Sequence, residues 1–479
     1  MSNRIFKVLV IEDENEVFEH VEGQFRDRCE RVEIEHASSR DEAINILKDE
    51  SSFFDYITLD LKIPVSRTSP VKEPNHGLAV LGEIVRHSPG TPVLILTGTS
   101  TVEMIQGFLQ QSRQADVWGT GREMGNLGHL TKSKLIELGG IIEQVYTDFS
   151  SLINIELSTD GLELPVQDDR LLRIFVNKHH GCLGNVSKIG GGLSNARVYA
   201  LTIKNDAGVV VHNAVCKCGP RNDIQEDVSN YRSFINRLLP EATPRLLGSQ
   251  DFGAGSTSGV LYGLAEKFND SFFSIAYKNE LNDSIKQSIR NMLRKWHDNH
   301  TQERKEIRQI RQYLLNDETA ERLIREFDIK YANEFEKESV HYKESCIHGD
   351  FHGENILIDN KNNAATLIDY GDVKVGPMLL DPITLECSFL FHPSSTKTLN
   401  WSDVDPENRW TDIESYCAEC PVLDSVKFCR EWMHQLKIGN REVAACLYSY
   451  SLRQLKYPNT NKKIALSLIK AAFKVFEDS

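Results

Sequence analysis

The sequence has no long apolar run, no excess of basic residues and no internal repeat or low-complexity segment. Across its 479 residues, no stretch approaches the roughly 20 consecutive apolar residues of a membrane-spanning helix. The formal net charge of −14 argues against a nucleic-acid partner, because such proteins usually carry a basic balance or stripe. We therefore predict a cytoplasmic protein that binds neither a membrane nor nucleic acid.

The sequence also lacks a regular cysteine framework. Its ten cysteines are scattered, which is typical of reduced thiols in a cytoplasm. Cys417 and Cys420 lie close together, with Cys429 and His434 downstream, but a structural zinc site usually needs two such clusters at regular spacing. We interpret the pair as a helix end followed by a loop and assign it no function.

The chain divides by its hydrophobic patterns. Residues 1–150 alternate short apolar runs with helical periodicity, which predicts a parallel sheet with helices. The segment 151–169 is acidic and contains Gly and Pro, and we expect it to be a short flexible connector. Strand-like runs occupy about 183–265, and helical periodicity then fills 281–345 and 410–479.

Four apolar runs in the first part end in polar residues. VLVIEDE ends at Glu12 and Asp13, YITLDLKIP contains Asp60, PVLILTG ends near Thr97, and LGHLTKS contains Lys132. Because the carboxyl ends of parallel strands meet at one edge of a sheet, we expect these side chains to converge. Three converging acids would repel one another unless a cation lay among them. This order predicts a site for a phosphorylated aspartate.

The pattern resembles the receiver domain of bacterial response regulators over about residues 4–145. The resemblance implies a flavodoxin-like fold with a five-stranded parallel sheet, in which a solvent-facing Asp60 accepts a phosphoryl group. It also implies that Asp13, Asp60 and the backbone carbonyl of Lys62 bind Mg²⁺, with Glu12 beside them.

The same resemblance implies that Thr97 and Lys132 bind the phosphoryl oxygens. The sequence departs from the family in a lengthened loop after Pro64 and in Ser133, where a proline is common. His129 stands where many receivers carry a Tyr or Phe that responds to phosphorylation. The alternative is a receiver-like fold used only for docking.

A glycine-rich stretch, IGGGLSNARVY, lies between two strand-like runs in the second part. Glycines let a backbone approach phosphates and expose its N–H groups to them. Lys217 interrupts the apolar run NAVCKCG and needs a partner, which Glu226 in the next helical stretch offers. The candidate nucleotide-binding residues of the stretch are Gly190, Gly191, Gly192, Ser194 and Asn195.

The stretch HGDFHGENILID carries Asp350 and Asn355 directly before an apolar run, and the next run, ATLIDYGD, carries Asp369. One carboxylate can orient a hydroxyl, while an amide and a second carboxylate can hold a hard cation through oxygen. His348 is expected to make structural hydrogen bonds, and Asp381 to brace the loop. These residues predict phosphoryl transfer with a magnesium nucleotide.

Together these motifs resemble the aminoglycoside phosphotransferase and choline kinase family, whose members are relatives of the protein kinases. The resemblance implies an α+β bilobal kinase domain over 170–479, with a small lobe at about 170–268 and a helical lobe at about 269–479. ATP would bind between the lobes. The stretch 261–268 would be the hinge that meets the adenine, and Glu266 would lie at the cofactor.

Residue roles follow from the same resemblance. Asp350 would orient the acceptor hydroxyl and accept its proton. Asn355 and Asp369 would hold Mg²⁺. Lys217 would hold the α- and β-phosphates, and Glu226 would hold Lys217.

Two features in the second part keep alternatives open. Asp372 could support either the substrate or the metal. The stretch from Arg290 to Arg311 has helix-like spacing and clustered basic residues, which fits a solvated helix face, an acidic substrate or a docking partner.

The chain as a whole is predicted to be an ATP- and Mg²⁺-dependent phosphotransferase that acts on a hydroxyl of a small molecule or a protein. Phosphorylation of Asp60, by a sensor histidine kinase or another phosphodonor, would regulate it. A homodimer is possible within this prediction. The alternative function is a non-catalytic scaffold made of a pseudokinase and a receiver in a signalling or conflict complex.

Overall fold

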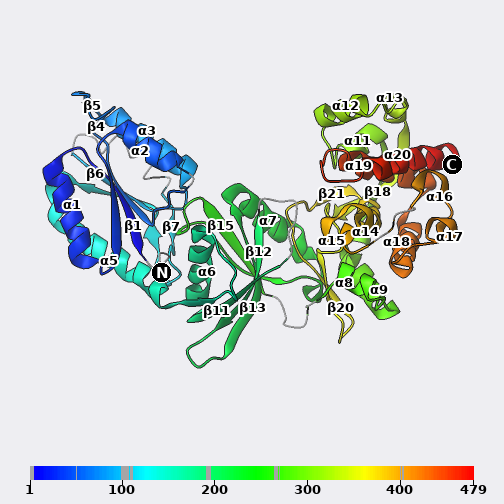
Figure 1. The fold of residues 1–479 in the computed structure, drawn as a ribbon, viewed down its shortest axis with the longest axis horizontal. Helices are drawn as coiled ribbons and strands as arrows, with labels where there is room; N and C mark the ends of the chain where they lie inside the picture. The colour runs from blue at the N-terminus through cyan, green and yellow to red at the C-terminus, as the bar shows by residue number, and fades with distance from the viewer. Residues whose placement is uncertain are drawn as a thin grey trace. The chain divides into compact units, whose positions relative to one another are not determined.

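The computed structural model describes residues 5–49, 51–98, 107, 110, 112–189, 196–263, 268, 270–399, 401 and 404–479. The chain forms two compact units (Figure 1). The first unit comprises residues 1–225 and 246–264, and the second comprises residues 226–245 and 265–479.

The first unit begins with a parallel five-stranded sheet in the order β2-β1-β3-β6-β9. Successive side chains of β1 point to opposite faces: Val8 packs with α1 and α5, and Leu9 packs with α2 and α3. This is the predicted flavodoxin-like arrangement. Its strands and helices are β1 (Phe6–Ile11), α1 (Asn15–Arg28), β2 (Val32–Ala37), α2 (Arg40–Lys48), β3 (Tyr56–Asp60), α3 (Pro74–His87), β6 (Val93–Thr97), β9 (Leu127–Thr131) and α5 (Leu138–Ser150).

Among the described residues, two short hairpins and two 3-10 helices complete this part of the unit. The lengthened loop after β3 forms one hairpin, and the segment before β9 forms the other. The elements are β4 (Ile63–Pro64), β5 (Lys72–Glu73), β7 (Gln114–Ala115), β8 (Met124–Gly125), η3 (Lys132–Glu137) and η4 (Ser151–Asn154).

A six-stranded sheet in the order β10-β11-β12-β13-β15-β14 forms the rest of the first unit. Leu171 and Phe175 of helix α6 are fully buried in a core that also contains Leu201 of β12 and Cys216 of β13. The elements are β10 (Glu156–Ser158), α6 (Val166–Lys178), β11 (Leu183–Lys188), β12 (Arg197–Lys204), β13 (Val210–Pro220), β14 (Arg245–Gln250) and β15 (Thr257–Gly263).

The expected connector, 151–169, is folded rather than flexible. It supplies η4, then β10, which pairs in parallel with β11 at the edge of the six-stranded sheet, and then the first turn of α6. The acidic composition was misleading, because exposed residues of a short edge strand and a helix start are also polar. The two sheets of the first unit are therefore joined by structured chain.

Backbone groups of the two sheets' loops meet directly. The Gly90 N–H donates to the Gly255 carbonyl at 2.8 Å, and the Gly253 N–H donates to the Gly90 carbonyl at 2.8 Å. Gly253 has φ +92°, and a Cβ there would collide with the carbonyl of Val117. Only glycine permits this approach. The contact between the loops of the two sheets, which we call the seam, therefore requires glycine at position 253.

A buried ion pair crosses the same seam. The Arg170 guanidinium of α6 lies 3.0 Å (Nε to Oδ1) and 3.2 Å (Nη2 to Oδ2) from Asp55, the residue before β3. The Arg170 guanidinium also stacks over the ring of Phe149 at 4.7 Å. Both charged side chains are almost fully buried, so removal of either would leave an uncompensated charge in the interior.

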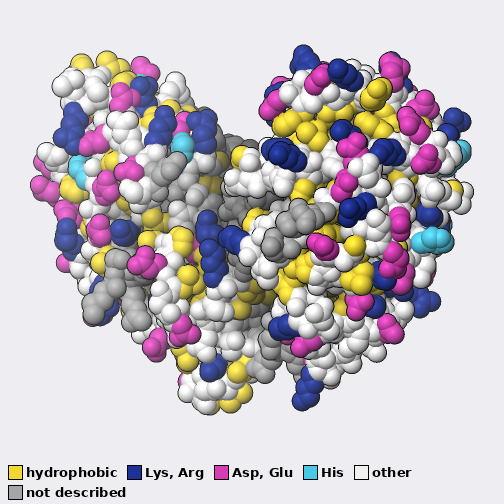
Figure 2. Space-filling model, turned by 45° about the vertical axis from the view of Figure 1, so that its right-hand side comes forward, with side chains coloured by type: hydrophobic (Ala, Val, Ile, Leu, Met, Phe, Trp, Pro, Cys, Tyr) yellow, Lys and Arg dark blue, Asp and Glu magenta, His cyan; other side chains and the backbone are white. Residues whose placement is uncertain are grey.

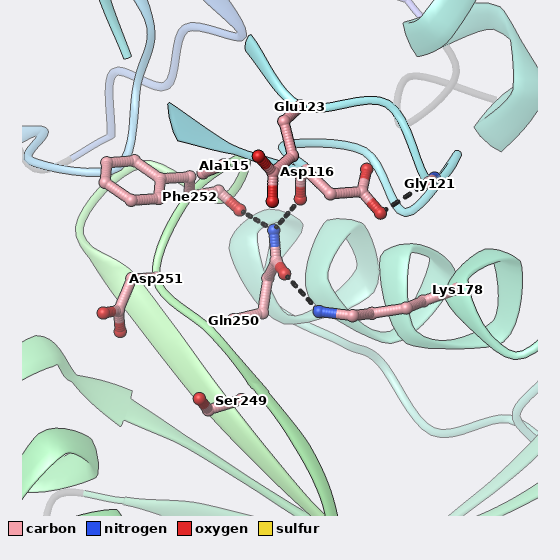
Figure 3. Close-up of a pocket in the computed structure, with 9 residues that line it drawn as sticks. All are labelled: Ala115, Asp116, Gly121, Glu123, Lys178, Ser249, Gln250, Asp251 and Phe252. Atoms are coloured by element: carbon pink, nitrogen blue, oxygen red, sulfur yellow. Dashed lines mark hydrogen bonds between the residues drawn. The ribbon is translucent and has the colours of Figure 1, made fainter. Parts of the chain in front are cut away.

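A cavity of about 440 Å³ opens on the seam (Figure 3). The Gln250 amide lies in its wall and donates to the carbonyls of Asp116, Val117 and Phe252, while its oxygen accepts from Lys178 at 3.4 Å. These hydrogen bonds give partners to both the nitrogen and the oxygen of the Gln250 amide, and they connect β14 to the segment before β8.

The second unit is mainly helical and contains two three-stranded sheets, β16-β19-β20 and β17-β18-β21. Helix α14 is buried along its entire length and forms the centre of the unit. Helix α7 (Arg221–Ser233) spans the division between the units. The strands are β16 (Asp270–Ser271), β17 (Thr301–Glu306), β18 (Ser339–Ile347), β19 (Ile356–Asp359), β20 (Ala364–Leu367) and β21 (Lys374–Pro377).

The long helices α18, α19 and α20 form the C-terminal part of this unit, and shorter helices precede them (Figure 1). The helices are α8 (Phe272–Tyr277), α9 (Asp283–Met292), α10 (Arg294–His297), α11 (Ile307–Arg311), α12 (Asp317–Glu326), α13 (Ala332–Phe335), α14 (Leu380–Phe391), α15 (Pro393–Thr396), α16 (Pro406–Arg409), α17 (Ile413–Tyr416), α18 (Leu423–Leu436), α19 (Asn440–Gln454) and α20 (Lys462–Glu477).

The helical prediction for 281–345 was partly wrong. Strand β17 interrupts the stretch from Arg290 to Arg311, which is therefore not one helix, and β18 follows α13. The residues of β17 are charged or polar and mostly exposed, so the strand shows no apolar alternation in the sequence. Cys417 closes α17, and its carbonyl accepts the N–H of Cys420, as expected for a helix end and loop.

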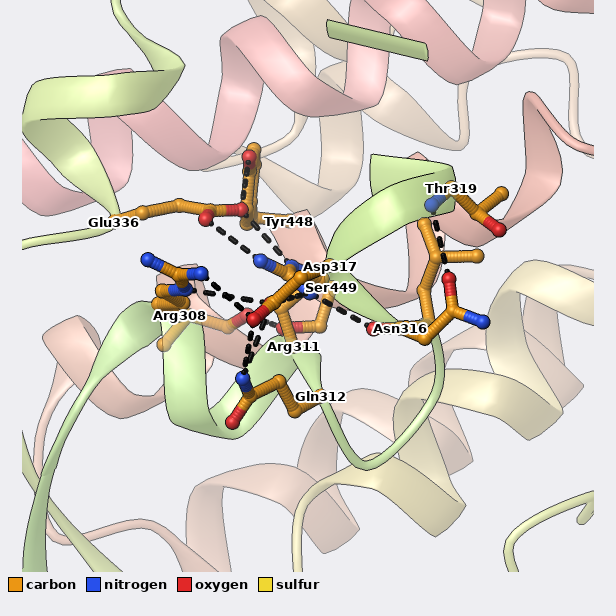
Figure 4. Close-up of polar contacts among 11 residues, drawn as sticks. Arg308, Arg311, Gln312, Asn316, Asp317, Thr319, Glu336, Tyr448 and Ser449 are labelled. Carbon is orange, nitrogen blue, oxygen red and sulfur yellow. Dashed lines mark hydrogen bonds and ion pairs between the residues drawn. The ribbon is translucent and has the colours of Figure 1, made fainter. Parts of the chain in front are cut away.

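Buried polar contacts brace the C-terminal helices (Figure 4). Arg311 is 1% exposed and binds both carboxylate oxygens of Glu336, at 3.0 and 2.9 Å. The Tyr448 hydroxyl of α19 donates to Glu336 at 2.9 Å, and Arg311 also binds Asp317 at 2.8 Å. This network holds α19 against α11 and α12.

Charged side chains of both signs are interspersed on the face shown in Figure 2. Among the helices that the structure describes, none has the length and apolar character needed to cross a bilayer.

Candidate functional site

The predicted acids of the first sheet do converge. Ligand oxygens of Glu12, Asp13 and Asp60 all lie within 4.8 Å of one another at the carboxyl ends of β1 and β3. Asp13 Oδ1 is buried and has no hydrogen-bond partner among the described residues. Carboxylate oxygens are the ligands that Mg²⁺ prefers, so the trio fits a bound divalent cation.

Two lysines face the trio. Lys132, which directly follows β9, lies 2.7 Å from Asp60 and 2.9 Å from Glu12. Lys72, from the lengthened loop, lies 2.5 Å from Asp13. Burial alone would lower the Lys132 pKa, but the nearby Asp60 and Glu12 outweigh it and raise it. The sequence predicted Lys132 and missed Lys72, because an inserted loop gives no periodic signal.

The side chains of this site are more enclosed than expected. Asp60 was predicted to face solvent, but its side chain is only 3% exposed, and the Lys62 N–H donates to it at 3.1 Å. Burial, followed by repulsion from Asp60, raises the pKa of Glu12 to about 7. Thr97 is fully buried at the end of β6. Asp60 therefore lies in an almost enclosed recess beside Glu12 and Asp13.

The nucleotide-binding residues predicted for the six-stranded sheet are only partly described. Lys217 lies in β13 between Val198 of β12 and Val260 of β15, and it is 7% exposed. The predicted residues Gly190, Gly191, Gly192, Ser194, Asn195 and Glu266 lie outside the described residues. Strands β11 and β12, which flank residues 190–195 in the sequence, pair antiparallel.

The acids of α7 differ in burial. Glu226, the predicted partner of Lys217, is exposed, whereas the next residue, Asp227, is fully buried. The assignment of Glu226 stays a prediction. Sequence reasoning overlooked Asp227, although its helical spacing from Ile224 and Tyr231 places it on the buried side.

In the second unit, the loop after β18 is held in a fixed shape. Gly349 has φ +80°, and a Cβ there would collide with the carbonyl of Asp372, so the two loops touch. Asp381 of α14 accepts the N–H groups of His348 (2.8 Å) and Gly349 (3.1 Å), as predicted for a brace. The His348 ring contacts the Ile368 carbonyl at 3.1 Å, which is the expected structural role.

The predicted base Asp350 and the predicted metal ligand Asn355 lie on this loop, and the second predicted ligand, Asp369, follows β20. The Asn355 amide donates to the Asp350 carbonyl at 2.9 Å, and the Asn355 carbonyl accepts the N–H of Ile368 at 3.0 Å. The latter bond brings Asn355 beside Asp369, which has φ +63°. Such a left-handed backbone is uncommon outside glycine and recurs at functional sites. Amide and carboxylate oxygens here fit a hard cation.

Asp350 has two basic neighbours within 4.0 Å among the described residues. His352 Nε2 lies 3.6 Å from Asp350 Oδ2, and Arg453 Nη2 lies 3.7 Å from Oδ1. Burial lowers the pKa of His352 to about 4, so this ring is neutral near pH 7. Arg453, on α19, was not predicted, because helical spacing alone does not reveal which loop a distant helix contacts.

The fold and these two acid sites are similar to those of a receiver domain followed by a phosphotransferase of the kinase-like class. Residues 8–115 match the family described as "Response regulator receiver domain", and residues 287–393 match the family described as "Phosphotransferase enzyme family". Both families are those expected from the sequence. No curated protein matches the chain.

Solved structures match each part of the chain. A response regulator receiver domain protein from Clostridium thermocellum is 22% identical, with 30% of this chain and 95% of that chain covered and a TM-score of 0.22. Plasmodium vivax ethanolamine kinase is 10% identical, with coverage of 67% and 93% and a TM-score of 0.32. An aminoglycoside-3'-phosphotransferase of type VIII is 13% identical, with coverage of 56% and 99% and a TM-score of 0.31.

Proposed function

We propose that this protein transfers the γ-phosphoryl group of Mg-ATP to an acceptor hydroxyl, under control of its receiver domain. The observation that carries the proposal is the loop of the second unit, where the Asn355 side-chain amide donates to the Asp350 carbonyl and the Asn355 carbonyl accepts the N–H of Ile368, the residue before Asp369. A non-catalytic scaffold has no need to keep all three groups in this arrangement.

In the proposed reaction, Asp350 accepts the proton of the acceptor hydroxyl as the hydroxyl oxygen bonds to the γ-phosphorus. The bond between that phosphorus and the β–γ bridging oxygen breaks, and ADP leaves. Asn355 and Asp369 would hold Mg²⁺, which when bound neutralises charge on the phosphates. Lys217 would hold the α- and β-phosphates, and Glu226, or the buried Asp227, is the candidate acid to orient it.

Regulation would begin at Asp60, phosphorylated by a sensor histidine kinase or a small phosphodonor. What supports coupling is helix α6, which contacts both sheets of the first unit. Its Arg170 binds Asp55 at the start of the strand that ends in Asp60. Its Asp168 binds Arg197 at 2.7 Å, two residues after the predicted nucleotide-binding Asn195. Helix α6 would therefore couple phosphorylation of Asp60 to the predicted nucleotide-binding residues.

Mg-ATP binding tests the proposed enzyme directly. We expect Mg-ATP, but not ATP with a chelator, to raise the thermal unfolding temperature of the full-length protein. Asp369→Ala should lose this Mg²⁺-dependent shift, while Asp283→Ala, at a fully exposed carboxylate, should keep it. If Mg-ATP causes no shift in the wild type, the scaffold alternative holds.

A further inference from the structure

The cation beside the proposed catalytic base comes from a helix far along the chain. Arg453 lies in the last turn of α19, and its Nη2 is 3.7 Å from Asp350 Oδ1. Its side chain is 17% exposed and that of Asp350 is 36% exposed, so the pair is partly open to solvent. The Arg453 Nε donates to the Tyr457 hydroxyl at 3.1 Å, whereas Nη2 is the atom near Asp350.

Arg453 is held in place rather than carried on a loose surface. Lys462 caps the end of α19, donating to the carbonyls of Leu455 at 2.9 Å and Gln454 at 3.3 Å. One turn earlier, Tyr448 ties α19 to the buried Arg311–Glu336 pair (Figure 4). A guanidinium fixed by its helix loses little entropy when it binds a ligand, so it is suited to recognition.

The charge at this position is positive whatever the state of its neighbours. Among the described residues, the other basic group within 4.0 Å of Asp350 is His352. An arginine, in contrast, stays protonated at all relevant pH values. Of the described groups within 4.0 Å of Asp350, Arg453 is therefore the one that keeps a fixed positive charge beside an acceptor hydroxyl.

We propose that Arg453 is a specificity-determining residue that selects small acceptors carrying a carboxylate or phosphate next to the hydroxyl to be phosphorylated. This inference rests on the proposed function of Asp350. The guanidinium fork matches the planar oxygens of both anions and would bind them through charge-assisted hydrogen bonds. An acceptor with an ammonium group in the same place is repelled by Arg453.

A series of three-carbon compounds isolates the charge of the acceptor. Glycerol is neutral, glycerate carries a carboxylate, glycerol 3-phosphate carries a phosphate, and 3-amino-1,2-propanediol carries an ammonium group. Binding of each to the full-length protein, saturated with Mg²⁺ and a non-hydrolysable ATP analogue, can be measured by ligand-observed NMR. We expect at least one anion to bind about tenfold or more tightly than the amine, because charge-assisted hydrogen bonds to arginine are strong.

The variants assign that preference to one side chain. Arg453→Gln should remove the anion preference, and Arg453→Lys should retain part of it. Arg441→Gln is the matched control, because Arg441 lies on the same helix, where it contacts the C-terminal Ser479, and the charge change is identical. If Arg453→Gln fails to fold, Arg453→Lys alone must still weaken the anion more than Arg441→Gln does.

The carboxylate and phosphate arms decide which anion the site takes. A wild type that prefers the amine, or shows no preference, overturns the inference, and so does an equal loss in Arg441→Gln. An Arg453→Gln variant that keeps the anion preference overturns it as well. A protein that binds no Mg-ATP overturns the proposed function instead, so the two failures are distinguishable.

Discussion

Asp60 is the last residue of strand β3 and Asp350 lies three residues after strand β18, but their surroundings differ. Asp60 is 3% exposed and shares a recess with two other carboxylates and two lysines. Asp350 is 36% exposed, and its near neighbours are a neutral histidine and one arginine. A crowded group of acids favours a cation, whereas a lone, accessible carboxylate can meet a hydroxyl. The same residue type therefore has two different environments, which suit the two roles proposed for it.

The largest expected contrast between the two aspartates is in phosphoryl labelling. Incubation with acetyl phosphate and Mg²⁺ should add one acid-stable, base-labile phosphoryl group, because Asp60 lies within reach of a cation site and Lys132. Asp60→Asn should abolish the label, and Asp350→Asn should retain it, as mass spectrometry of the intact protein can show. Labelling that persists in Asp60→Asn would contradict the proposed role of Asp60 as the phosphoryl acceptor.

Removing the buried ion pair of the seam should strongly destabilise the first unit. Arg170→Ala leaves Asp55 charged in the interior, which costs about 3–5 kcal/mol of unfolding free energy. Arg26→Ala, at an exposed helix pair with Glu22, should cost no more than about 1 kcal/mol.

Urea unfolding of the full-length protein measures both variants. Equal losses of unfolding free energy in Arg170→Ala and Arg26→Ala would show that the buried pair stabilises the unit no more than an exposed pair does. Deletion of residues 1–150 would remove Asp55 and Phe149 from α6, so we expect this variant to be unstable rather than an independent kinase.

The histidines near Asp350 predict an acid-sensitive second unit. Burial lowers the pKa of His352 and His392 to about 4, from 6.5 in an unfolded chain. As pH falls from 6.5 towards 4, the unfolded chain takes up protons that the folded protein does not. The free energy of unfolding should then fall by up to about 1.4 kcal/mol per pH unit for each histidine.

His392→Gln should flatten this slope, and His20→Gln, at an exposed position, should not. Urea unfolding at pH 6.5, 5.5 and 4.5 provides the comparison. A slope that is unchanged in His392→Gln would show that this ring titrates normally.

The smallest expected effect concerns Lys72 in the recess. Its ammonium lies 2.5 Å from Asp13 and would compete with a divalent cation for the same carboxylate. Lys72→Ala should raise Mg²⁺ affinity, by up to about fivefold for an interaction of about 1 kcal/mol. Arg67→Ala, in the same loop but paired with Glu42, should leave it unchanged. Mg²⁺ can be titrated into each variant and its binding followed by tryptophan fluorescence, since Trp118 lies in this unit.

The sequence predicted those features that depend on strand order and local motifs. Glu12, Asp13 and Asp60 were expected to meet because the carboxyl ends of parallel strands share one edge, and they lie within 4.8 Å. Asp381 was expected to brace its loop, and it does so with two hydrogen bonds.

Features that depend on long-range packing could not be predicted. Lys72 comes from an insertion without periodicity, and Arg453 from a helix whose contacts are set by tertiary packing. The seam depends on backbone approach at Gly253, which in sequence is one glycine among many. Strand β17 was mistaken for helix, because its charged residues fit both periods.

Turnover of ATP by the Asp350→Asn variant tests the central claim most directly. The carboxamide keeps the size and the loop contacts of Asp350 but cannot accept a proton. We predict that Mg-ATP binding is retained and that turnover falls by about 10²–10⁴-fold relative to the wild type. Turnover at the wild-type rate in Asp350→Asn would contradict the assignment of this loop as the site of phosphoryl transfer.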